Sequence, residues 1–218
     1  MLKTSKMKKF DTDSIATMSK IPRLNLINSV TGYKSANLIG TISKEGILNV
    51  AIFSSITHLG SNPALLGFMI RPIASTPRDT YTNIKDNQYF TVNHITKAMI
   101  ADAHHTSSAY DSGISEFEKT NFEPEFLEDQ KVPFVKGSPV QLLCKFVNEY
   151  PILENGCIHL IASIEKIYVE DELLQKENWV RLDLAEVVTI NGLDAYAVPN
   201  LIDRMEYARP DQPTKSML

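Results

Sequence analysis

The chain lacks several features that mark large classes of protein. It has 218 residues and a formal net charge of −4, so it has no basic surplus of the kind that nucleic-acid binding requires. Its apolar segment 65–70 is far shorter than the roughly 18 residues that a membrane-spanning helix needs. Four lysines stand among the first nine residues, but no apolar stretch of signal-peptide length follows them. These absences predict a cytoplasmic protein with no nucleic-acid partner and no membrane partner.

Several motifs of well-known enzyme classes are also missing. The nine glycines never form G-x-G-x-x-G, and there is no G-x-x-x-x-G-K-[ST], no H-E-x-x-H and no G-x-S-x-G. The sequence therefore gives no motif support for four classes of function: dinucleotide binding by a βαβ unit, P-loop chemistry, zincin chemistry and α/β-hydrolase chemistry.

Cysteine and histidine give little sign of redox or metal chemistry. Cys144 and Cys157 are not in C-x-x-C spacing and lie among apolar strand-forming residues, so we expect two reduced, buried thiols, with a disulfide as the alternative. His104 and His105 are neighbours and would point about 100° apart on a helix. The other three histidines have no carboxylate or cysteine at ligand spacing, so no metal site is predicted.

The segments that are present alternate between strands and turns. Composition and periodicity predict strands at 36–43, 48–56, 65–71, 89–95, 141–150 and 157–169. Short helices are expected from Asp79 to about Asn87 and from Thr96 or Lys97 to about His105, with Asp79 as the N-cap of the first. Six strands with only short helices predict a mainly β fold, a β-barrel with helical additions.

The domain organisation follows from where the composition changes. Residues 1–20 are polar and predict a flexible arm, 21–210 form the domain, and 211–218 a C-terminal tail. Within the domain, 106–138 is irregular and broken by proline and glycine. A loop of this length usually covers a site or wraps a partner.

The strand 48–56 carries small and polar residues in a suggestive order. Asn49, Ala51, Phe53 and Ser55 share one face of such a strand, and Ser54 lies on the other. Small residues let a flat ring approach the backbone, so this strand is a candidate ring-binding surface. An ordinary half-buried hairpin strand is the alternative.

The segment that follows is a candidate phosphate cradle. Residues 75–80 (S-T-P-R-D-T) combine hydroxyl groups, the Arg78 guanidinium and the free N–H groups of a helix start. Such a helix start binds phosphate through its dipole and unpaired amides, and Arg78 would add charge-assisted hydrogen bonds. Asp79 has the wrong charge for a phosphate unless its carboxylate caps the helix. Arg71 is the next candidate for the same role, and a solvated helix start is the alternative.

The order of these motifs resembles that of the flavin reductase-like family, whose members bind FMN in a split β-barrel. The matching segments are N-V-A-I-F-S at 49–54, D-T-Y-T-N-I at 79–84, Q-Y-F-T-V-N at 88–93, Leu143-Cys144, His159, G-L-D-A-Y at 192–196 and R-M-E-Y-A-R-P at 204–210. The resemblance spans about residues 23–210 and implies an FMN-binding split β-barrel.

The resemblance also implies an activity and a set of binding residues. It implies an NAD(P)H-dependent flavin reductase in which NADH or NADPH passes hydride to the flavin, with His159 on the nicotinamide side. Since the family builds its flavin site at a two-fold interface, a homodimer is implied, and a partner oxygenase, ferric iron or another acceptor would receive the electrons. The implied cofactor-binding residues are Asn49, Ala51, Phe53, Ser54, Ser55, Arg71, Arg78, Asp79, Thr80 and Asn83.

Two departures from the family pattern lie near His159. The usual glycine four residues later is Ser163, and the usual Gly-Asp before the histidine is Cys157-Ile158. Two alternatives therefore stay open beside the reductase. One is a non-enzymatic FMN carrier or redox sensor. The other is a pyridoxamine phosphate oxidase-like flavoprotein, although Arg71 and Arg78 are too close in sequence to suggest two phosphate sites.

Overall fold

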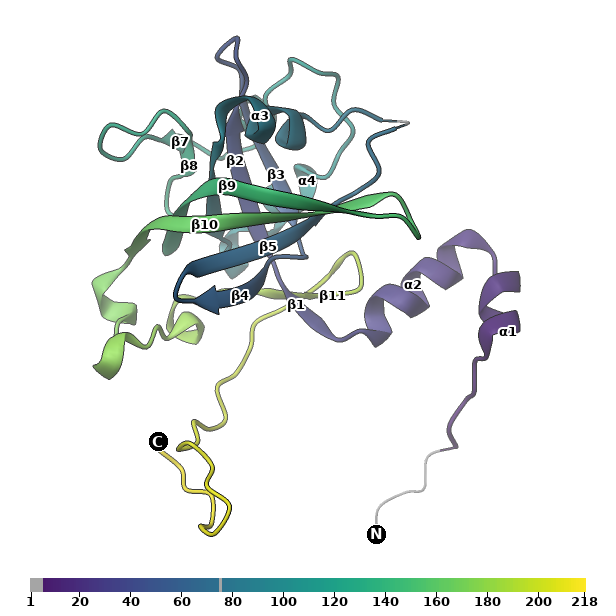
Figure 1. The fold of residues 1–218 in the computed structure, drawn as a ribbon, viewed down its shortest axis with the longest axis vertical. Coiled ribbons are helices and arrows are strands. Elements are labelled where there is room, and N and C mark those ends of the chain that lie inside the picture. Colours follow the sequence, from purple (N-terminus) through teal and green to yellow (C-terminus); the bar gives the residue numbers. More distant parts are fainter. Residues whose placement is uncertain (1–5, 75) are drawn as a thin grey trace.

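The computed structural model describes residues 6–74 and 76–218, and its centre is an antiparallel sheet of seven strands (Figure 1). The strands are β2 (Asn37–Ile42), β3 (Leu48–Phe53), β4 (Thr57–Ser61), β5 (Ala64–Ile70), β6 (Tyr89–His94), β9 (Val140–Ile152) and β10 (Cys157–Val169). Their order in the sheet is β3-β2-β6-β9-β10-β5-β4. All six predicted strands are present, and β4 is an additional one.

The sheet curls around a core without closing, which makes it a split barrel. Its two edge strands, β3 and β4, follow each other in the chain but share no backbone ladder within the described ranges. The fold is mainly β with a few short helices, as the sequence predicts. No helix in the described part of the chain is long and apolar enough to cross a membrane.

Apolar side chains at alternating positions along the strands point inward and fill the barrel. The buried interior cluster consists of Ile39, Leu66, Phe68, Ile70, Ile84, Phe90, Val92, Cys144, Leu160 and Ala162. Phe68 makes edge-to-face contacts with Phe53 and Phe90, at ring-centroid distances of 5.3 and 5.6 Å. Both cysteines are free thiols, but only Cys144 is buried; the expectation of burial is wrong for Cys157, which is half-buried beside the hairpin loop. Burial raises the pKa of Cys144 well above its ordinary value. That thiol behaves as a small core residue.

The remaining elements pack around the sheet. They are α3 (Asp79–Asn87), η1 (Lys97–Met99), α4 (Ile100–His105), η2 (Glu116–Glu118), η3 (Asp171–Leu173), η4 (Lys176–Asn178), η5 (Leu182–Ala185), the small sheet β1 (Tyr33–Ser35), β11 (Thr189–Asn191) and β12 (Ala195–Ala197), and the β7 (Pro124–Glu125) and β8 (Phe134–Val135) pair. α3 also contributes Ile84 to the interior cluster. A second buried cluster lies under α4, η2 and β11, and includes Leu38, Val50 and Ile95. The 106–138 segment is therefore mostly irregular, as expected, and packs on the barrel.

The β9–β10 hairpin closes with a loop of four residues, because its strands pair as far as Ile152 and Cys157. Gly156 has φ 72°, and the Asn155 Oδ1 atom accepts a hydrogen bond from the Cys157 amide at 2.9 Å. Both residues thus shape the end of this loop.

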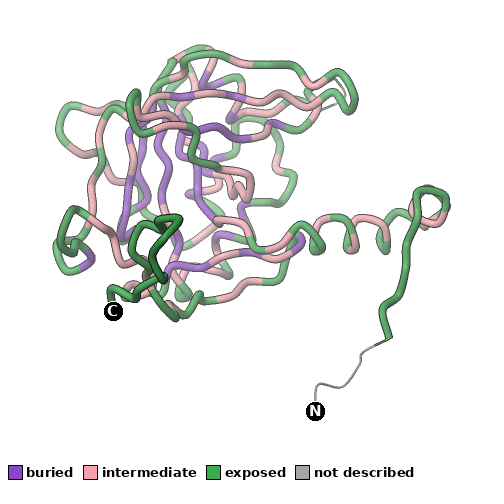
Figure 2. Tube along the Cα trace, turned by 60° about the horizontal axis from the view of Figure 1, so that its bottom comes forward, coloured by how far each residue is buried: buried purple, intermediate pink, exposed green. Residues whose placement is uncertain are grey.

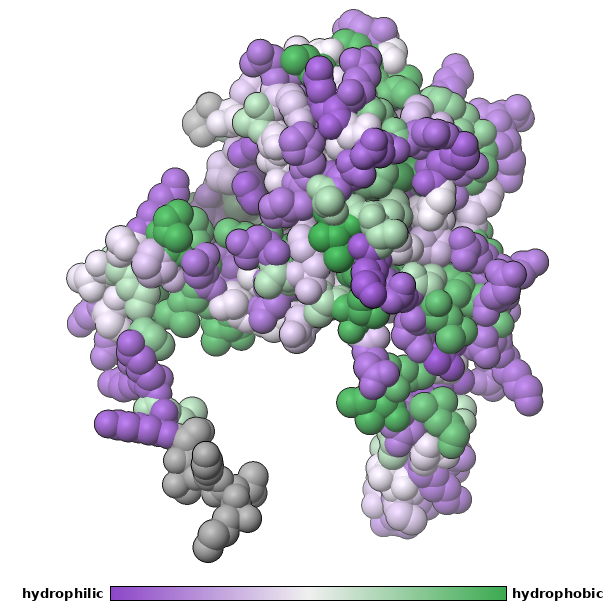
Figure 3. Space-filling model, turned by 180° about the vertical axis from the view of Figure 1, so that it is seen from behind, coloured by the Kyte–Doolittle hydropathy of each residue, from purple (hydrophilic) through white to green (hydrophobic). Residues whose placement is uncertain are grey.

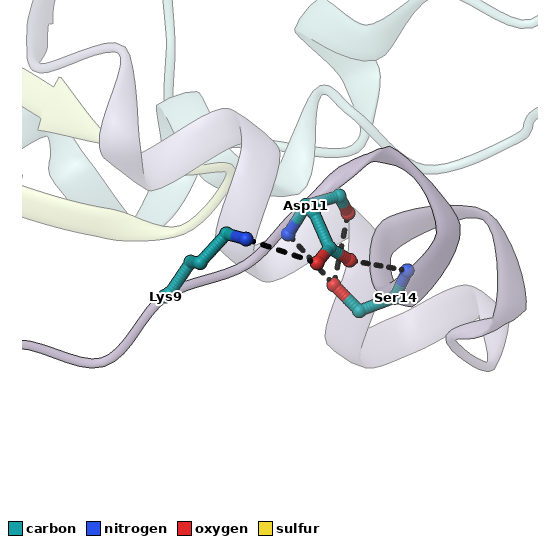
Figure 4. Close-up of polar contacts among 3 residues, drawn as sticks. All are labelled: Lys9, Asp11 and Ser14. Atoms are coloured by element: carbon teal, nitrogen blue, oxygen red, sulfur yellow. Dashed lines mark hydrogen bonds and ion pairs between the residues drawn. The ribbon is translucent and has the colours of Figure 1, made fainter.

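Two helices precede the barrel and project away from it (Figure 1). They are α1 (Thr12–Thr17) and α2 (Lys20–Val30), and neither contains a buried residue (Figure 2). α1 begins with a capping box, in which the Ser14 amide donates to Asp11 Oδ1 at 3.1 Å and the Asp11 amide donates to Ser14 Oγ at 2.8 Å (Figure 4). Lys9 adds an exposed ion pair to Asp11. The described part of the predicted arm therefore contains a short helix after an irregular segment at 6–11, while the domain limits at residues 20 and 210 stay a prediction.

Candidate functional site

The predicted phosphate cradle lies at the start of α3, and its cap differs from the prediction. Arg78 is the N-cap residue, and no side chain caps the helix. Asp79 is instead the first helical residue, and its Oδ1 atom accepts a hydrogen bond from the Ser112 hydroxyl at 3.3 Å. The expectation that helix amides occupy the Asp79 carboxylate is therefore wrong, because the helix begins one residue earlier than predicted.

Arg78 presents an unmatched donor at this helix start. Its Nε atom is buried and donates to no acceptor in the described ranges. Thr80 is buried two residues later, and the first amides of α3 have no side-chain partner. A buried guanidinium N–H beside free helix amides is complementary to an anion. Ser75, which the sequence also places in this cradle, lies outside the described residues, and Arg71 is exposed just after β5.

A second group of predicted residues lines a polar cavity on another side of α3. This cavity, of about 340 Å³, is lined by Ser43, Lys44, Glu45, Ile47, Leu48, Asn49, Asp79, Thr82, Asn83, Asp86, Ser112, Gly113 and Ile114. Its charged residues are three acids and one lysine, and Lys44 is paired with Asp86 at 2.8 Å. Arg78 does not line it. The cavity is therefore acidic, and a phosphate is better matched to the Arg78 side of the helix start.

Two of the asparagines in the predicted set make structural contacts. The Asn83 amide donates to Thr41 Oγ1 at 3.0 Å, which fixes α3 against β2 in a buried position. The Asn49 amide donates at 3.1 Å to Glu116 Oε2, an atom that also accepts from the Val50 amide. Sequence reasoning missed Glu116, because it lies 67 residues from Asn49 in an irregular segment with no periodic signal.

Glu116 is also perturbed electrostatically. Burial raises the pKa of its carboxyl group above the ordinary value, while hydrogen bonds from the backbone oppose that shift, and the charge of Asp79 adds to it. Glu116 thus ties the covering segment 106–123 to the edge strand β3, beside the polar cavity.

The predicted ring-binding strand is only partly available at the surface. Ala51 pairs with Ile39, which belongs to the barrel interior, and Phe53 contacts Phe68 there. Ser55 Oγ accepts a hydrogen bond from the Met69 amide at 3.0 Å, which ties the end of β3 to β5. Ser54 is half-buried, and its hydroxyl group makes no hydrogen bond within the described ranges. The small residues at the end of β3, rather than the whole strand, remain the ring-binding candidates.

His159 lies on the side of the β5–β10 ladder that faces away from the interior cluster. Its neighbour Leu160 belongs to that cluster, and a Cβ atom added at Gly67 would lie 2.5 Å from His159 Nε2. The ring therefore rests over Gly67, where β5 has no side chain.

These residues can bind a ligand and orient it. Clusters of three or more histidine, cysteine or acidic residues that could hold a metal are absent from the described residues. The described side chains instead provide a cationic helix start, a strand end with small hydroxyl residues and a histidine on an outer sheet face. Such a set fits a flat, phosphorylated cofactor that carries its own reactivity.

Comparison with known proteins identifies the family of the chain. A model of the flavin reductase like domain matches residues 32–184. An uncharacterized protein of Aquifex aeolicus (strain VF5) is 30% identical over 139 residues, which cover 63% of this chain and 70% of that protein.

Solved structures agree with the sequence match. A protein assigned as a flavin reductase with a split barrel domain, from Shewanella frigidimarina NCIMB 400, has a TM-score of 0.89 and 39% identity, covering 93% of this chain and all of that one. Nitrilotriacetate monooxygenase component B from Bacillus cereus has a TM-score of 0.80 at 20% identity, covering 92% of this chain and all of that one, which shows a shared fold. The chain belongs to the flavin reductase-like domain family and has its split-barrel fold.

Proposed function

We propose that the protein is an FMN-binding oxidoreductase, an NAD(P)H:flavin reductase. FMN would supply the hydride-accepting chemistry, and the chain would hold and orient the reactants. Family membership supports a flavin-related redox function, and the absence of sequence motifs for a nucleophile or metal agrees with chemistry that the cofactor carries.

One observation carries the proposal: the buried Arg78 Nε atom without an acceptor, next to the uncapped start of α3. A buried charged donor is costly unless an acceptor satisfies it. A phosphate monoester would accept from this N–H and from the helix amides at the same point. Thr80, buried on the first turn, supplies a hydroxyl group within the same cradle.

The ring end of FMN is assigned to Ser54 and Ser55 at the end of β3. Small side chains there allow close approach of a planar ring to the backbone. We assign Asn49, Ala51, Phe53 and Asn83 a supporting role, since their side chains already pack or bond within the barrel wall.

We also propose that the functional unit is a homodimer. α2 projects from the barrel with no buried residue and exposes Ile21, Ile27 and Val30 to solvent (Figure 3, where the N-terminal helices lie on the left). A helix of 11 residues is marginal in water without packing. A second copy would supply the missing contacts.

The phosphate contact is tested by comparing two ligands. Arg78→Ala removes a charge-assisted contact, so FMN binding should weaken by roughly ten- to a hundredfold. Riboflavin has no phosphate, and its affinity should change little. Fluorescence quenching gives both affinities, and Arg209→Ala in the exposed C-terminal tail is the matched control. Equal losses for both ligands would mean that Arg78 shapes the loop, and no loss would move the phosphate elsewhere, with Arg71 as the next candidate.

The reductase and the carrier are separated by turnover. NADH or NADPH should bleach the flavin band anaerobically and faster than it reduces free FMN, and NADH oxidation should continue when free flavin is added. Bleaching by dithionite alone would support the carrier.

A further inference from the structure

A second cavity lies between β1, the end of β6 and the segments 179–189 and 199–203, and no residue of α3 lines it. Its volume is about 450 Å³, which is within the range of small-molecule sites. It is lined by Ser35, Ala36, His94, Trp179, Val180, Leu182, Asp183, Val187, Val188, Thr189, Pro199, Asn200, Leu201, Ile202 and Asp203. None of these residues lines the polar cavity beside α3. The flavin cradle described above therefore does not account for it.

The walls are mostly apolar, with one aromatic plane. Trp179 is the only tryptophan of the chain, and the Arg204 guanidinium lies 4.3 Å from its ring centroid. Leu182 and Leu201 are half-buried aliphatic walls. An indole held by a cation and flanked by leucines favours a planar apolar guest.

The charged groups around this cavity already have partners. Arg181 forms a two-point pair with Asp183, with N–O distances of 2.8 and 2.6 Å, and Arg204 is 3.7 Å from Glu177. The Asp203 carboxylate accepts from the Ser216 hydroxyl at 2.7 Å. An anionic guest would therefore be desolvated without gaining a free cation, because both arginines are already paired with carboxylates.

Unused hydrogen-bonding capacity lies in this cavity, at His94, and next to it, at Asn37, which does not itself line the cavity. His94 lines it, and burial lowers the pKa of this imidazole to about 4, so the ring is neutral near pH 7. Asn37, which pairs with His94 across β2 and β6, is 1% exposed. Its Oδ1 and Nδ2 atoms both lack a partner among the residues that the structure describes. Buried amides of this kind are rarely left unsatisfied.

We propose that the cavity between Trp179, Leu182 and His94 binds an uncharged, planar aromatic molecule that carries one hydrogen-bonding group. The aromatic part packs on Trp179 and the leucine walls, and the polar group meets His94. The Ser35 hydroxyl donates to the Ile56 carbonyl at 3.0 Å, which places the wall of this cavity beside the segment that follows β3.

The probe is 2-acetonaphthone, compared with 2-naphthoate, which is similar in shape but anionic, and 2-ethylnaphthalene, which lacks the acceptor. Trp179 fluorescence reports this cavity, and calorimetry gives the stoichiometry. We expect one 2-acetonaphthone per chain, with 2-naphthoate and 2-ethylnaphthalene bound at least roughly tenfold more weakly. Titrations are run with and without saturating FMN. The proposal would be overturned if 2-acetonaphthone did not bind or if 2-naphthoate bound with equal affinity. Competition by FMN would also overturn it, because it would assign the cavity to the flavin site.

Two variants locate the probe. Val180→Phe fills part of the cavity and should weaken 2-acetonaphthone binding at least roughly tenfold, whereas Val147→Phe on the exposed side of β9 should leave it unchanged. Leu182→Ala removes wall contacts and should act in the same direction, so the test stands if one variant fails to fold. Binding unaffected by both folded variants would place the probe elsewhere and overturn the assignment. FMN affinity of the same variants is measured in parallel, so failure here is distinguishable from failure of the proposed function.

Discussion

The Val50 amide of edge strand β3 donates a hydrogen bond to the Glu116 carboxylate, at 3.1 Å. The same Oε2 atom accepts from the Asn49 side chain at 3.1 Å. An edge strand needs partners for its outward-facing amides, and here a side chain from a turn 66 residues away provides one. The contact holds the segment 106–123 over the barrel.

Removing this acceptor should destabilise the protein. Glu116→Ala leaves the Val50 amide and the Asn49 side chain unsatisfied, at a cost of about 1–3 kcal/mol in the free energy of unfolding. Urea denaturation measures the change. Glu118→Ala, at an exposed position on the same turn, should change it by less than about 0.5 kcal/mol. Equal effects of the two substitutions would mean that the contact is not stabilising.

The pH dependence of this contact has a definite sign. Burial raises the folded-state pKa of Glu116 above its ordinary value of 4.5, so the folded protein holds a proton that the unfolded chain has released. The stability of the wild type relative to Glu116→Gln should therefore fall as the pH rises from about 4 through the raised pKa. Urea unfolding of both proteins between about pH 4 and 7 tests this; a rising difference would contradict the burial argument.

Acid should destabilise the protein through His94. The unfolded chain takes up a proton near the ordinary histidine pKa of 6.5, whereas the folded protein does so only near pH 4, because the ring is buried. Stability present above pH 6.5 is thus lost on acidification, by roughly 2–3 kcal/mol at about pH 4.5. His94→Gln should remove this part of the pH dependence, and His58→Gln, at an exposed position, should not. Identical pH profiles for wild type and His94→Gln would refute the prediction.

The place of His159 over Gly67 is tested by a double-mutant cycle. Gly67→Ala would put a methyl group 2.5 Å from His159 Nε2 and 3.0 Å from Leu59 Cδ1, so we expect a loss of about 1–3 kcal/mol. In a His159→Ala background the same substitution should cost at least about 1 kcal/mol less, because the ring no longer occupies that space. Thermal unfolding gives both values, and additive losses would show that the ring does not rest there.

The proposed dimer predicts a molar mass of twice 24.5 kDa by size-exclusion chromatography with light scattering. If α2 packs on the second copy, replacing Ile21, Ile27 and Val30 together by lysine should weaken the dimer, because the apolar contacts are lost. Asn25→Lys, also exposed on α2, is the control. A monomeric wild type that still binds FMN would contradict an interface location of the flavin site.

The sequence by itself determined the local elements and their order. The strand segments and the helix from Asp79 to Asn87 follow from local composition, because each depends on the conformational preferences of neighbouring residues. The motif order was also enough to indicate the family.

Only the tertiary structure decided which side chains remain available for binding. Asn49, Phe53 and Asn83 occur in suggestive motifs, yet they bond or pack within the barrel wall. Arg78 replaces Asp79 as the cap residue and keeps a buried N–H without an acceptor in the described chain.

The same holds for residues that no motif marks. Glu116 reaches β3 from an irregular segment, and His94 meets Trp179 at one cavity across 85 residues of sequence. Contacts of this kind depend on how segments far apart in the sequence pack together, and local periodicity does not predict that packing.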